Sequence, residues 1–359
     1  MKEQYKLPRT FKKAATATTL AAVAVAVTAA PSVATPLQAS AQVVNGVLVV
    51  HGTNAADQIT LDFGAELTSS AATVTFGDGR AQRFDATTFR SASVFLGAGD
   101  DAFHAVSGGS TQTDVPLYVA GGAGNDSVAG GAAADVLDGG TGNDSVLGGA
   151  GNDLVLGGLG ADLVDGGVGT DTELLGSGDD VALWNPGEGN DAIEGGRGAD
   201  TLVFNGSDGA EQMSLAASGQ HAVFLRNLGN IRMDLNDVER LDLATLGGAD
   251  TVTVGDLSGT DIAEADIHLS AASGAGDGAV DTVVVAGSNA ADHVDVAADA
   301  GAVAVNGLAA RTVISGMDTN AASKDKLQVS TGDGDDRVAA SDAARALVDL
   351  VVDLGTGQR

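Results

Sequence analysis

The sequence predicts an all-β protein in which a parallel β-roll is flanked by β-rich modules. A nine-residue motif recurs in tandem, with glycines, an aspartate and an aliphatic residue at fixed positions. Aromatic residues make up only 3% of the 359-residue chain, against 52 glycines, and most apolar residues are Ala, Val or Leu. Small and β-branched side chains suit thin, stacked β-layers better than a wide globular core.

Residues 1–41 are predicted to be an export signal. Basic residues cluster at the start of the chain: Lys2, Lys6, Arg9, Lys12 and Lys13. An Ala/Val/Thr-rich run follows at 14–30, which is short and weakly hydrophobic for a membrane anchor. The preferred cleavage site follows Ala41, and an alternative site follows Ala34. We therefore expect an extracellular protein, secreted through an N-terminal signal peptide, with no transmembrane anchor in the mature chain.

The charge and the cysteine content limit the partners. The formal net charge is −30, so nucleic acid and anionic membrane surfaces would be repelled. The sequence contains no cysteine, so a glycine-rich, exported chain must be stabilised by something other than disulfides. Cations are the expected partners, and a metal ion is the expected stabilising element.

The tandem motif has a period of nine, and its units begin at residues 121, 130, 139, 148, 157 and 166. A seventh unit, from 175, lacks the first glycine; Trp184 and Asn185 then intervene, as a predicted bulge that interrupts the roll, before units from 186 and 195. Glycines at positions 1, 2 and 4 are expected to allow positive φ and to bring backbone carbonyls close to a common centre. The aliphatic residue at position 8 lies in a three-residue strand and points inward. Each unit is therefore predicted to form a turn and a strand.

Two units close one coil, so residue i is expected to stack on residue i+18, about 4.8 Å away. This places the position-6 aspartates in two columns, one with Asp126, Asp144, Asp162 and Asp180, the other with Asp135, Asp153 and Asp171. Two unit charges at that distance repel by about 1 kcal/mol in water and roughly 3.5 kcal/mol at an effective dielectric of 20. The metal-free roll is therefore predicted to be unstable.

A divalent cation between successive turns would remove this repulsion. Residues 121–203 contain neither Cys nor His, so only oxygen ligands are available, which favours Ca²⁺ over Mg²⁺ or Zn²⁺. The predicted ligands are Asp126, Asp135, Asp144, Asp153, Asp162, Asp171, Asp180, Asp191 and Asp200. Five pairs have the spacing of 18, namely 126/144, 135/153, 144/162, 153/171 and 162/180. The insertion spaces pairs 171/191 and 180/200 by 20, which leaves open whether they form sites.

The tandem pattern GGxGxDxUx, in which U is aliphatic, resembles the calcium-binding nonapeptide of the RTX (repeats-in-toxin, hemolysin-type) family. That resemblance covers residues 121–203 and implies a parallel β-roll with Ca²⁺ bound in its turns. The segments "WNPGEGNDAIEGGRGADTLVFNGSDGAEQMSL" and "LGGADTVTVGDLSGTD" resemble sequences that accompany such repeats in secreted bacterial calcium-binding proteins. Three residues depart from the pattern: Ala133 replaces a glycine, Glu173 an inward aliphatic residue, and Ala182 a larger one.

The predicted organisation is a signal peptide (1–41), an N-terminal β module (42–118), the roll (119–203), a β-rich connecting segment (204–280) and a C-terminal β module (281–359). The two terminal modules are predicted to be copies, because "VLVVHGTNAADQITL" at 47–61 matches "TVVVAGSNAADHVDV" at 282–296. Asp57 and Asp101, like Asp292 and Asp336, are separated by 44 residues. The pairs Asp100-Asp101 and Asp335-Asp336 could be isolated calcium turns, but solvated turns are favoured.

The sequence contains no HExxH, GxSxG or P-loop motif, and we expect the protein not to be an enzyme. The favoured function is a secreted calcium-binding repeat protein whose roll folds on binding Ca²⁺ and which has a structural or surface-interaction role. The alternative is an accessory or remnant of a secreted RTX toxin or enzyme whose effector activity is not recognisable.

Overall fold

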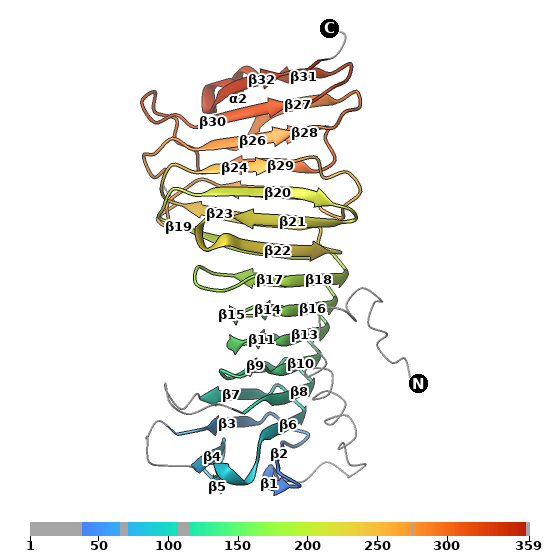
Figure 1. Cartoon of the computed structure of the whole chain (residues 1–359), viewed down its shortest axis with the longest axis vertical. Helices are drawn as coiled ribbons and strands as arrows, with labels where there is room; N and C mark the ends of the chain where they lie inside the picture. The colour runs from blue at the N-terminus through green and yellow to red at the C-terminus, as the bar shows by residue number, and fades with distance from the viewer. Residues whose placement is uncertain (1–37, 65–70, 107–114, 275, 357–359) are drawn as a thin grey trace. The chain divides into compact units, whose positions relative to one another are not determined.

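The computed structural model describes residues 38–64, 71–106, 115–274 and 276–356. The chain divides into two compact units between Leu156 and Gly157, within the predicted roll. Both units consist almost entirely of strands in long, mainly parallel sheets (Figure 1), which confirms the predicted all-β fold. Most of the predicted export signal, residues 1–37, lies outside the described residues.

The first unit has two sheets. In one, the order is β1 (Ser40–Val44), β2 (Val47–His51), β6 (Ser91–Ala98), β8 (Leu117–Ala123) and β10 (Val136–Thr141). In the other, it is β5 (Ala81–Asp85), β4 (Ala71–Phe76), β3 (Gln58–Asp62), β7 (Ala102–Val106), β9 (Ser127–Ala129) and β11 (Ser145–Leu147). A 3-10 turn, η2 (Ala86–Thr88), and a short strand, β12 (Ala150–Gly151), complete the unit; β13 (Leu154–Leu159) crosses the division.

The second unit also has two sheets. One contains β16 (Thr172–Ser177), β18 (Ala192–Arg197), β22 (Ile231–Asn236), β21 (His221–Arg226), β20 (Gln212–Ser218), β24 (Thr251–Val254), β26 (Thr282–Ala286), β30 (Lys326–Ser330) and β32 (Asp349–Asp353). The other contains β14 (Leu163–Asp165), β17 (Val181–Trp184), β19 (Thr201–Ser207), β23 (Arg240–Leu246), β25 (Glu264–His268), β29 (Arg311–Ser315), β28 (Ala302–Asn306), β27 (His293–Asp299) and β31 (Arg337–Ala340). The shorter elements are β15 (Val168–Gly169), η3 (Leu228–Asn230) and α2 (Asp342–Leu347).

Strand register follows the nine-residue period. In the first unit β10 pairs in parallel with β8, and Val136 lies opposite Tyr118, a spacing of 18. In the second unit Leu163 of β14 lies opposite Val181 of β17, again 18 residues apart. After Trp184 and Asn185 the spacing becomes 20, as in the pairing of β16 with β18. The insertion therefore lengthens one coil without breaking the parallel sheets.

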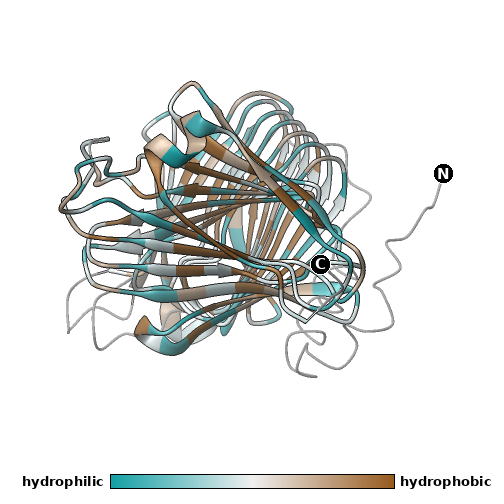
Figure 2. Ribbon diagram, turned by 90° about the horizontal axis from the view of Figure 1, so that it is seen from above, coloured by the Kyte–Doolittle hydropathy of each residue, from teal (hydrophilic) through white to brown (hydrophobic). Residues whose placement is uncertain are grey.

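Within the repeats, the core is formed by the inward side chains at position 8 of the nine-residue motif. Val128 and Val146 in the first unit are 1% exposed, and Val164 and Leu202 in the second unit are fully buried. In Figure 2 the hydrophobic residues lie mainly along the strands. Trp184 was expected to mark a bulge, but its side chain belongs to the core. It is 1% exposed and stacks on Phe204, with ring centroids 4.1 Å apart.

Three segments of the described chain share one topology: β2 to β7 (47–106), β19 to β24 (201–254) and β26 to β31 (282–340). In each, the first strand pairs in parallel with the fifth and the second with the sixth. The second, third and fourth strands form an antiparallel meander. The parallel register is 44 residues in the outer two segments and 39 in the middle one. The middle copy was not anticipated from the sequence.

The two ends of the described chain each add an edge strand. Ser40 and Ala41 pair with His51 and Val50 in β1 and β2, so the preferred cleavage site falls inside a strand, whereas the alternative site after Ala34 lies outside the described residues. At the other end, α2 precedes β32. No helix among the described residues is long and apolar enough to cross a membrane.

Candidate metal centre

All nine predicted aspartates lie at the corners of the coils with side chains 0–4% exposed. In the first unit the backbone N–H of Asp126 donates to Oδ1 of Asp144 at 2.8 Å. The N–H of Asp135 donates to Oδ1 of Asp153 at the same distance. In both pairs the corner carboxylate thus receives a hydrogen bond from the backbone of the previous aspartate in its column.

The same bond forms in the second unit. The N–H of Asp162 donates to Oδ1 of Asp180 at 2.8 Å. It also forms at the 20-residue spacings, from Asp171 to Asp191 at 2.8 Å and from Asp180 to Asp200 at 2.9 Å. The insertion therefore preserves the corner geometry of pairs 171/191 and 180/200. Pairs 144/162 and 153/171 combine residues of different units and stay predictions.

The glycines of the turn are needed for two different reasons. Gly122, at position 2, has a φ of +112°, and a Cβ there would lie 2.1 Å from the carbonyl oxygen of Gly97. Gly121, at position 1, is outside the left-handed region, so it does not use the positive φ that glycine allows. A Cβ on Gly121 would lie 2.3 Å from the carbonyl oxygen of Gly139 and 2.6 Å from Oδ2 of Asp126, so position 1 must be glycine to make room for the next coil and for the carboxylate.

At several corners the second carboxylate oxygen has no hydrogen-bond partner among the described residues. Oδ2 of Asp126, Asp180 and Asp200 is buried and accepts no hydrogen bond within the described part of the chain. Burial raises the pKa of Asp180 to about 6 and that of Asp200 to about 7. A buried carboxylate that lacks a partner is costly unless a cation or a proton neutralises it.

The donor set fits Ca²⁺. No group of three or more acidic or histidine side chains in the described ranges could hold a metal by itself. A cation would therefore need backbone carbonyl oxygens in addition to carboxylates, and such mixed, all-oxygen shells suit Ca²⁺. The stacked turns supply carbonyls: those of Gly97 and Gly99 face the next coil at Gly122 and Gly124.

The column of carboxylates continues in the residues N-terminal to the predicted repeats. Asp101 is 2% exposed, its Oδ1 accepts the N–H of Asp57 at 2.7 Å, and its Oδ2 has no hydrogen-bond partner in the described chain. Burial raises its pKa to about 6. The interpretation of Asp100-Asp101 as a solvated turn is therefore wrong for Asp101, while Asp100 is exposed.

In the second unit, the column also continues in the residues C-terminal to the repeats. The N–H of Asp200 donates to Oε2 of Glu239 at 2.7 Å. Further corner bonds join 211 to 250, 250 to 281, 281 to 325 and 292 to 336, each at 2.8 Å. Most of these residues were not expected from the sequence. The signal that could have found them is an acidic residue two positions before a buried apolar one, as at Glu211/Met213, Asp250/Val252, Asp281/Val283 and Asp325/Leu327.

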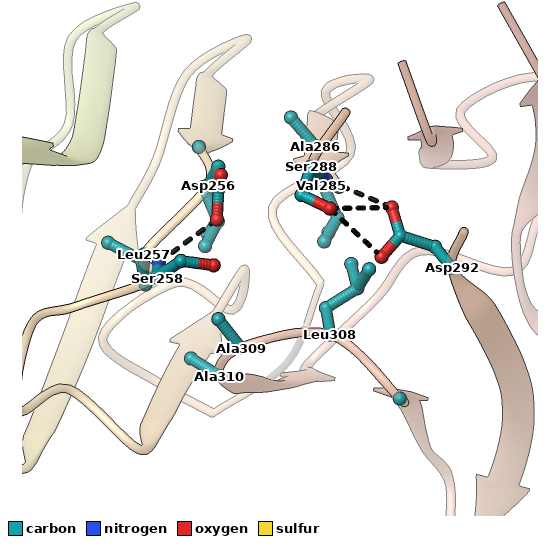
Figure 3. Close-up of a pocket in the computed structure, with 14 residues that line it drawn as sticks. Asp256, Leu257, Ser258, Val285, Ala286, Ser288, Asp292, Leu308, Ala309 and Ala310 are labelled. Carbon is teal, nitrogen blue, oxygen red and sulfur yellow. Dashed lines mark hydrogen bonds between the residues drawn. The ribbon is translucent and has the colours of Figure 1, made fainter. Parts of the chain in front are cut away.

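At some of these corners, residues of the same turn donate hydrogen bonds to the second carboxylate oxygen. Thr53 donates from its backbone N–H to Oδ2 of Asp57 at 2.6 Å and from its hydroxyl at 2.8 Å. In the equivalent turn of the third copy, the N–H of Ser288 donates to Oδ2 of Asp292 at 2.9 Å, beside a pocket of about 70 Å³ (Figure 3). Oδ2 of Asp336 accepts from the Thr331 hydroxyl at 2.9 Å. The second oxygens of these carboxylates have donors, whereas Oδ2 of Asp126, Asp180 and Asp200 has none among the described residues.

The corner of the middle copy contains its own cation. Glu211 and Arg226 are 1% and 7% exposed, and Nε of Arg226 donates to Oε1 of Glu211 at 2.7 Å. Nη2 of Arg226 contacts the same oxygen, and the Ser207 hydroxyl donates to it at 2.8 Å. The guanidinium therefore neutralises this corner within the protein.

Comparison with protein families identifies the repeats. The family model of the RTX calcium-binding nonapeptide repeat matches four copies, at residues 118–146, 138–173, 147–182 and 187–210. The matches contain all nine predicted aspartates and exclude Asp101 and Glu211. No curated protein matches the chain.

Proposed function

We propose that this chain, which carries calcium-binding RTX repeats, is exported, folds its roll when it meets calcium outside the cell, and then has a structural or surface-interaction role. In this proposal the protein has no enzymatic activity. The calcium stabilises the fold and does not take part in a reaction.

The main support for the proposal is the second carboxylate oxygen, Oδ2, of the repeat aspartates Asp126, Asp180 and Asp200. Oδ1 of Asp126 is approached by the backbone N–H of Asp101, whereas its Oδ2 is buried without a donor in the described chain. Asp180 and Asp200 repeat the arrangement in the second unit. Successive like charges repel without metal, and a divalent cation converts that repulsion into attraction.

Export is supported by the sequence of the first 41 residues and by the supply of calcium. Extracellular calcium modules work with dissociation constants of about 10⁻⁴ to 10⁻³ M, so a roll of this affinity would stay unfolded inside the cell. The net charge of −30 keeps such an unfolded chain soluble and favours cations as partners.

Calcium-dependent folding is tested by circular dichroism and by the fluorescence of the single tryptophan. In excess chelator the chain should give a reduced β signal and a solvent-exposed Trp184. Adding Ca²⁺ should restore the β signal and shift the emission to the blue, because Trp184 is 1% exposed and stacked on Phe204 in the folded chain. Mg²⁺ is the matched control. A full β spectrum in chelator, unchanged by calcium, would contradict the proposal.

Export is tested by fractionating cells that express the full chain and by measuring the mass of the mature protein. We expect the protein in the secreted or wall fraction, with cleavage after Ala34 or Ala41. A chain that begins at residue 42 is the control and should stay inside the cell. Recovery of the uncleaved full chain in the cytoplasm alone would rule out export.

A further inference from the structure

Glu173 is a carboxylate where the other repeat units have an apolar side chain. It lies at position 8 of its unit, in β16, directly opposite Ile193 of β18. Other repeats in the second compact unit have Val164, Ala182 and Leu202 at position 8, and all three are fully buried. Glu173 is equally enclosed, at 2% exposed, so packing alone would favour an aliphatic residue here.

Among the described residues, the carboxylate of Glu173 has no partner that explains its burial. Its Oε2 accepts no hydrogen bond within the described residues. None of the ion pairs found among those residues includes Glu173. The charges that act on it are all negative, and they belong to Asp191, Asp171, Asp165 and Glu188.

The side chain is directed at the corner of its own turn. A Cβ placed on Gly166 would lie 2.9 Å from Oε1 of Glu173 and 2.8 Å from Oδ2 of Asp171. The two oxygens therefore converge on the first glycine of the turn. Asp171 is a corner residue of the second column, since its N–H donates to Oδ1 of Asp191 at 2.8 Å.

We propose that Glu173 is a calcium ligand, which together with Asp171 forms a site that joins the core of the roll to the 166–171 turn. Its position-8 carboxylate supplies an oxygen from inside the coil, where the aliphatic residues of the other units can supply none. Oxygen donors from two carboxylates and from backbone carbonyls match the preference of Ca²⁺. The proposal rests on the calcium-binding function proposed above and adds a ligand outside the repeat pattern.

Two substitutions separate a ligand from a packing residue. Glu173→Gln keeps the shape of the side chain and removes its charge, whereas Glu173→Leu supplies the aliphatic residue found in other units. Glu194→Gln is the matched control, because Glu194 lies in β18 and its Oε1 accepts a hydrogen bond from Nδ2 of Asn236 at 2.8 Å. The full-length chain is used for all three variants.

Bound calcium is counted by equilibrium dialysis against ⁴⁵Ca²⁺, and circular dichroism at saturating calcium checks the fold. We expect Glu173→Gln and Glu173→Leu to lose one calcium per chain, or to bind it at least about tenfold more weakly, while Glu194→Gln matches the unmodified chain. An unchanged count and affinity in both Glu173 variants would overturn the assignment, above all if Glu173→Leu also unfolds at a higher temperature in calcium. If the unmodified chain binds no calcium, the proposed function fails as well.

Discussion

The backbone N–H of Asp101 donates to Oδ1 of Asp126 at 2.8 Å, across 25 residues of sequence. The strands that precede them pair in parallel, with Gly97 opposite Gly122. Gly99 and Gly124 both have positive φ, at +118° and +134°. The turn at 97–101 therefore has the geometry of a repeat turn, although the family match begins only at residue 118. In this unit the column of carboxylates is longer than the repeat sequence.

Replacing Asp101 with asparagine should remove a calcium site outside the matched repeats. Asp101 is 2% exposed, and its Oδ2 has no hydrogen-bond partner in the described chain, so a cation between its turn and that of Asp126 would lose a charged ligand. Equilibrium dialysis should show one calcium fewer per chain. Asp100→Asn is the control, because Asp100 is exposed and its Oδ1 accepts the N–H of Asn125. Equal calcium binding by both variants would show that the turn of Asp101 holds no calcium.

The same bond changes what is expected of Asp126. From the nine-residue repeats alone, Asp126 is the last residue of its column, and Asp126→Ala should disturb one site, against two for Asp153→Ala. Because Asp101 lies next to it, Asp126→Ala should disturb two sites. The end of the column is Asp57, whose Oδ2 is already bonded to Thr53, so Asp57→Ala should leave the calcium count unchanged. A smaller loss of calcium in Asp126→Ala than in Asp153→Ala would favour the shorter column.

The repeats were predictable because each unit contains all of its own signals. Glycine, aspartate and the inward aliphatic residue recur within nine positions, so the pairing of Val136 with Tyr118 follows from counting. Beyond the repeats the corner residues are separated by 25, 31, 39 or 44 positions, because meanders and loops of variable length lie between them. The spacing between corner residues is then no longer constant along the sequence. Only the strand pairing in the structure shows that Asp250 lies against Asp281.

The middle copy of the β module was missed for a related reason. Its corner residue is Glu211 rather than aspartate, and its parallel strands are 39 residues apart instead of 44. The shared feature is the strand pairing, which tolerates changes of loop length and of side chain. Trp184 was misjudged because a nine-residue frame shows where two residues are inserted but cannot show that the indole packs on Phe204.

The stability of the metal-free chain should fall as the pH rises from about 4 to about 7. Burial raises the pKa of Asp153, Asp191 and Asp200 from 3.8 to about 7. Between these two values the folded chain binds more protons than the unfolded chain, so raising the pH favours unfolding. Thermal unfolding in chelator should show this trend. Calcium must displace the same protons, so the calcium affinity should rise over the same pH window. A metal-free chain that gains stability from pH 4 to pH 7 would contradict the assignment.

Removing the internal cation of the middle copy should destabilise the protein in a way that calcium does not repair. Arg226 and Glu211 form a buried ion pair, and the Arg226 guanidinium also lies 5.4 Å from the centre of the Trp184 ring. Breaking one partner of a buried pair costs about 3–5 kcal/mol because the other charge stays buried. Arg226→Met should therefore lower the thermal midpoint at saturating calcium.

Two further variants identify the cause of that loss. Arg226→Met combined with Glu211→Gln should recover part of the stability, because no charge is left buried without a partner. Glu211→Gln alone should leave the calcium count unchanged, since the guanidinium and the Ser207 hydroxyl already occupy Oε1 of Glu211. If instead Arg226→Met binds one calcium more than the unmodified chain and keeps its thermal midpoint, the Glu211 corner is an ordinary site of the column from which Arg226 excludes the ion. Calcium counts and thermal midpoints of the three variants, measured together, decide between a structural ion pair and a calcium site filled by arginine.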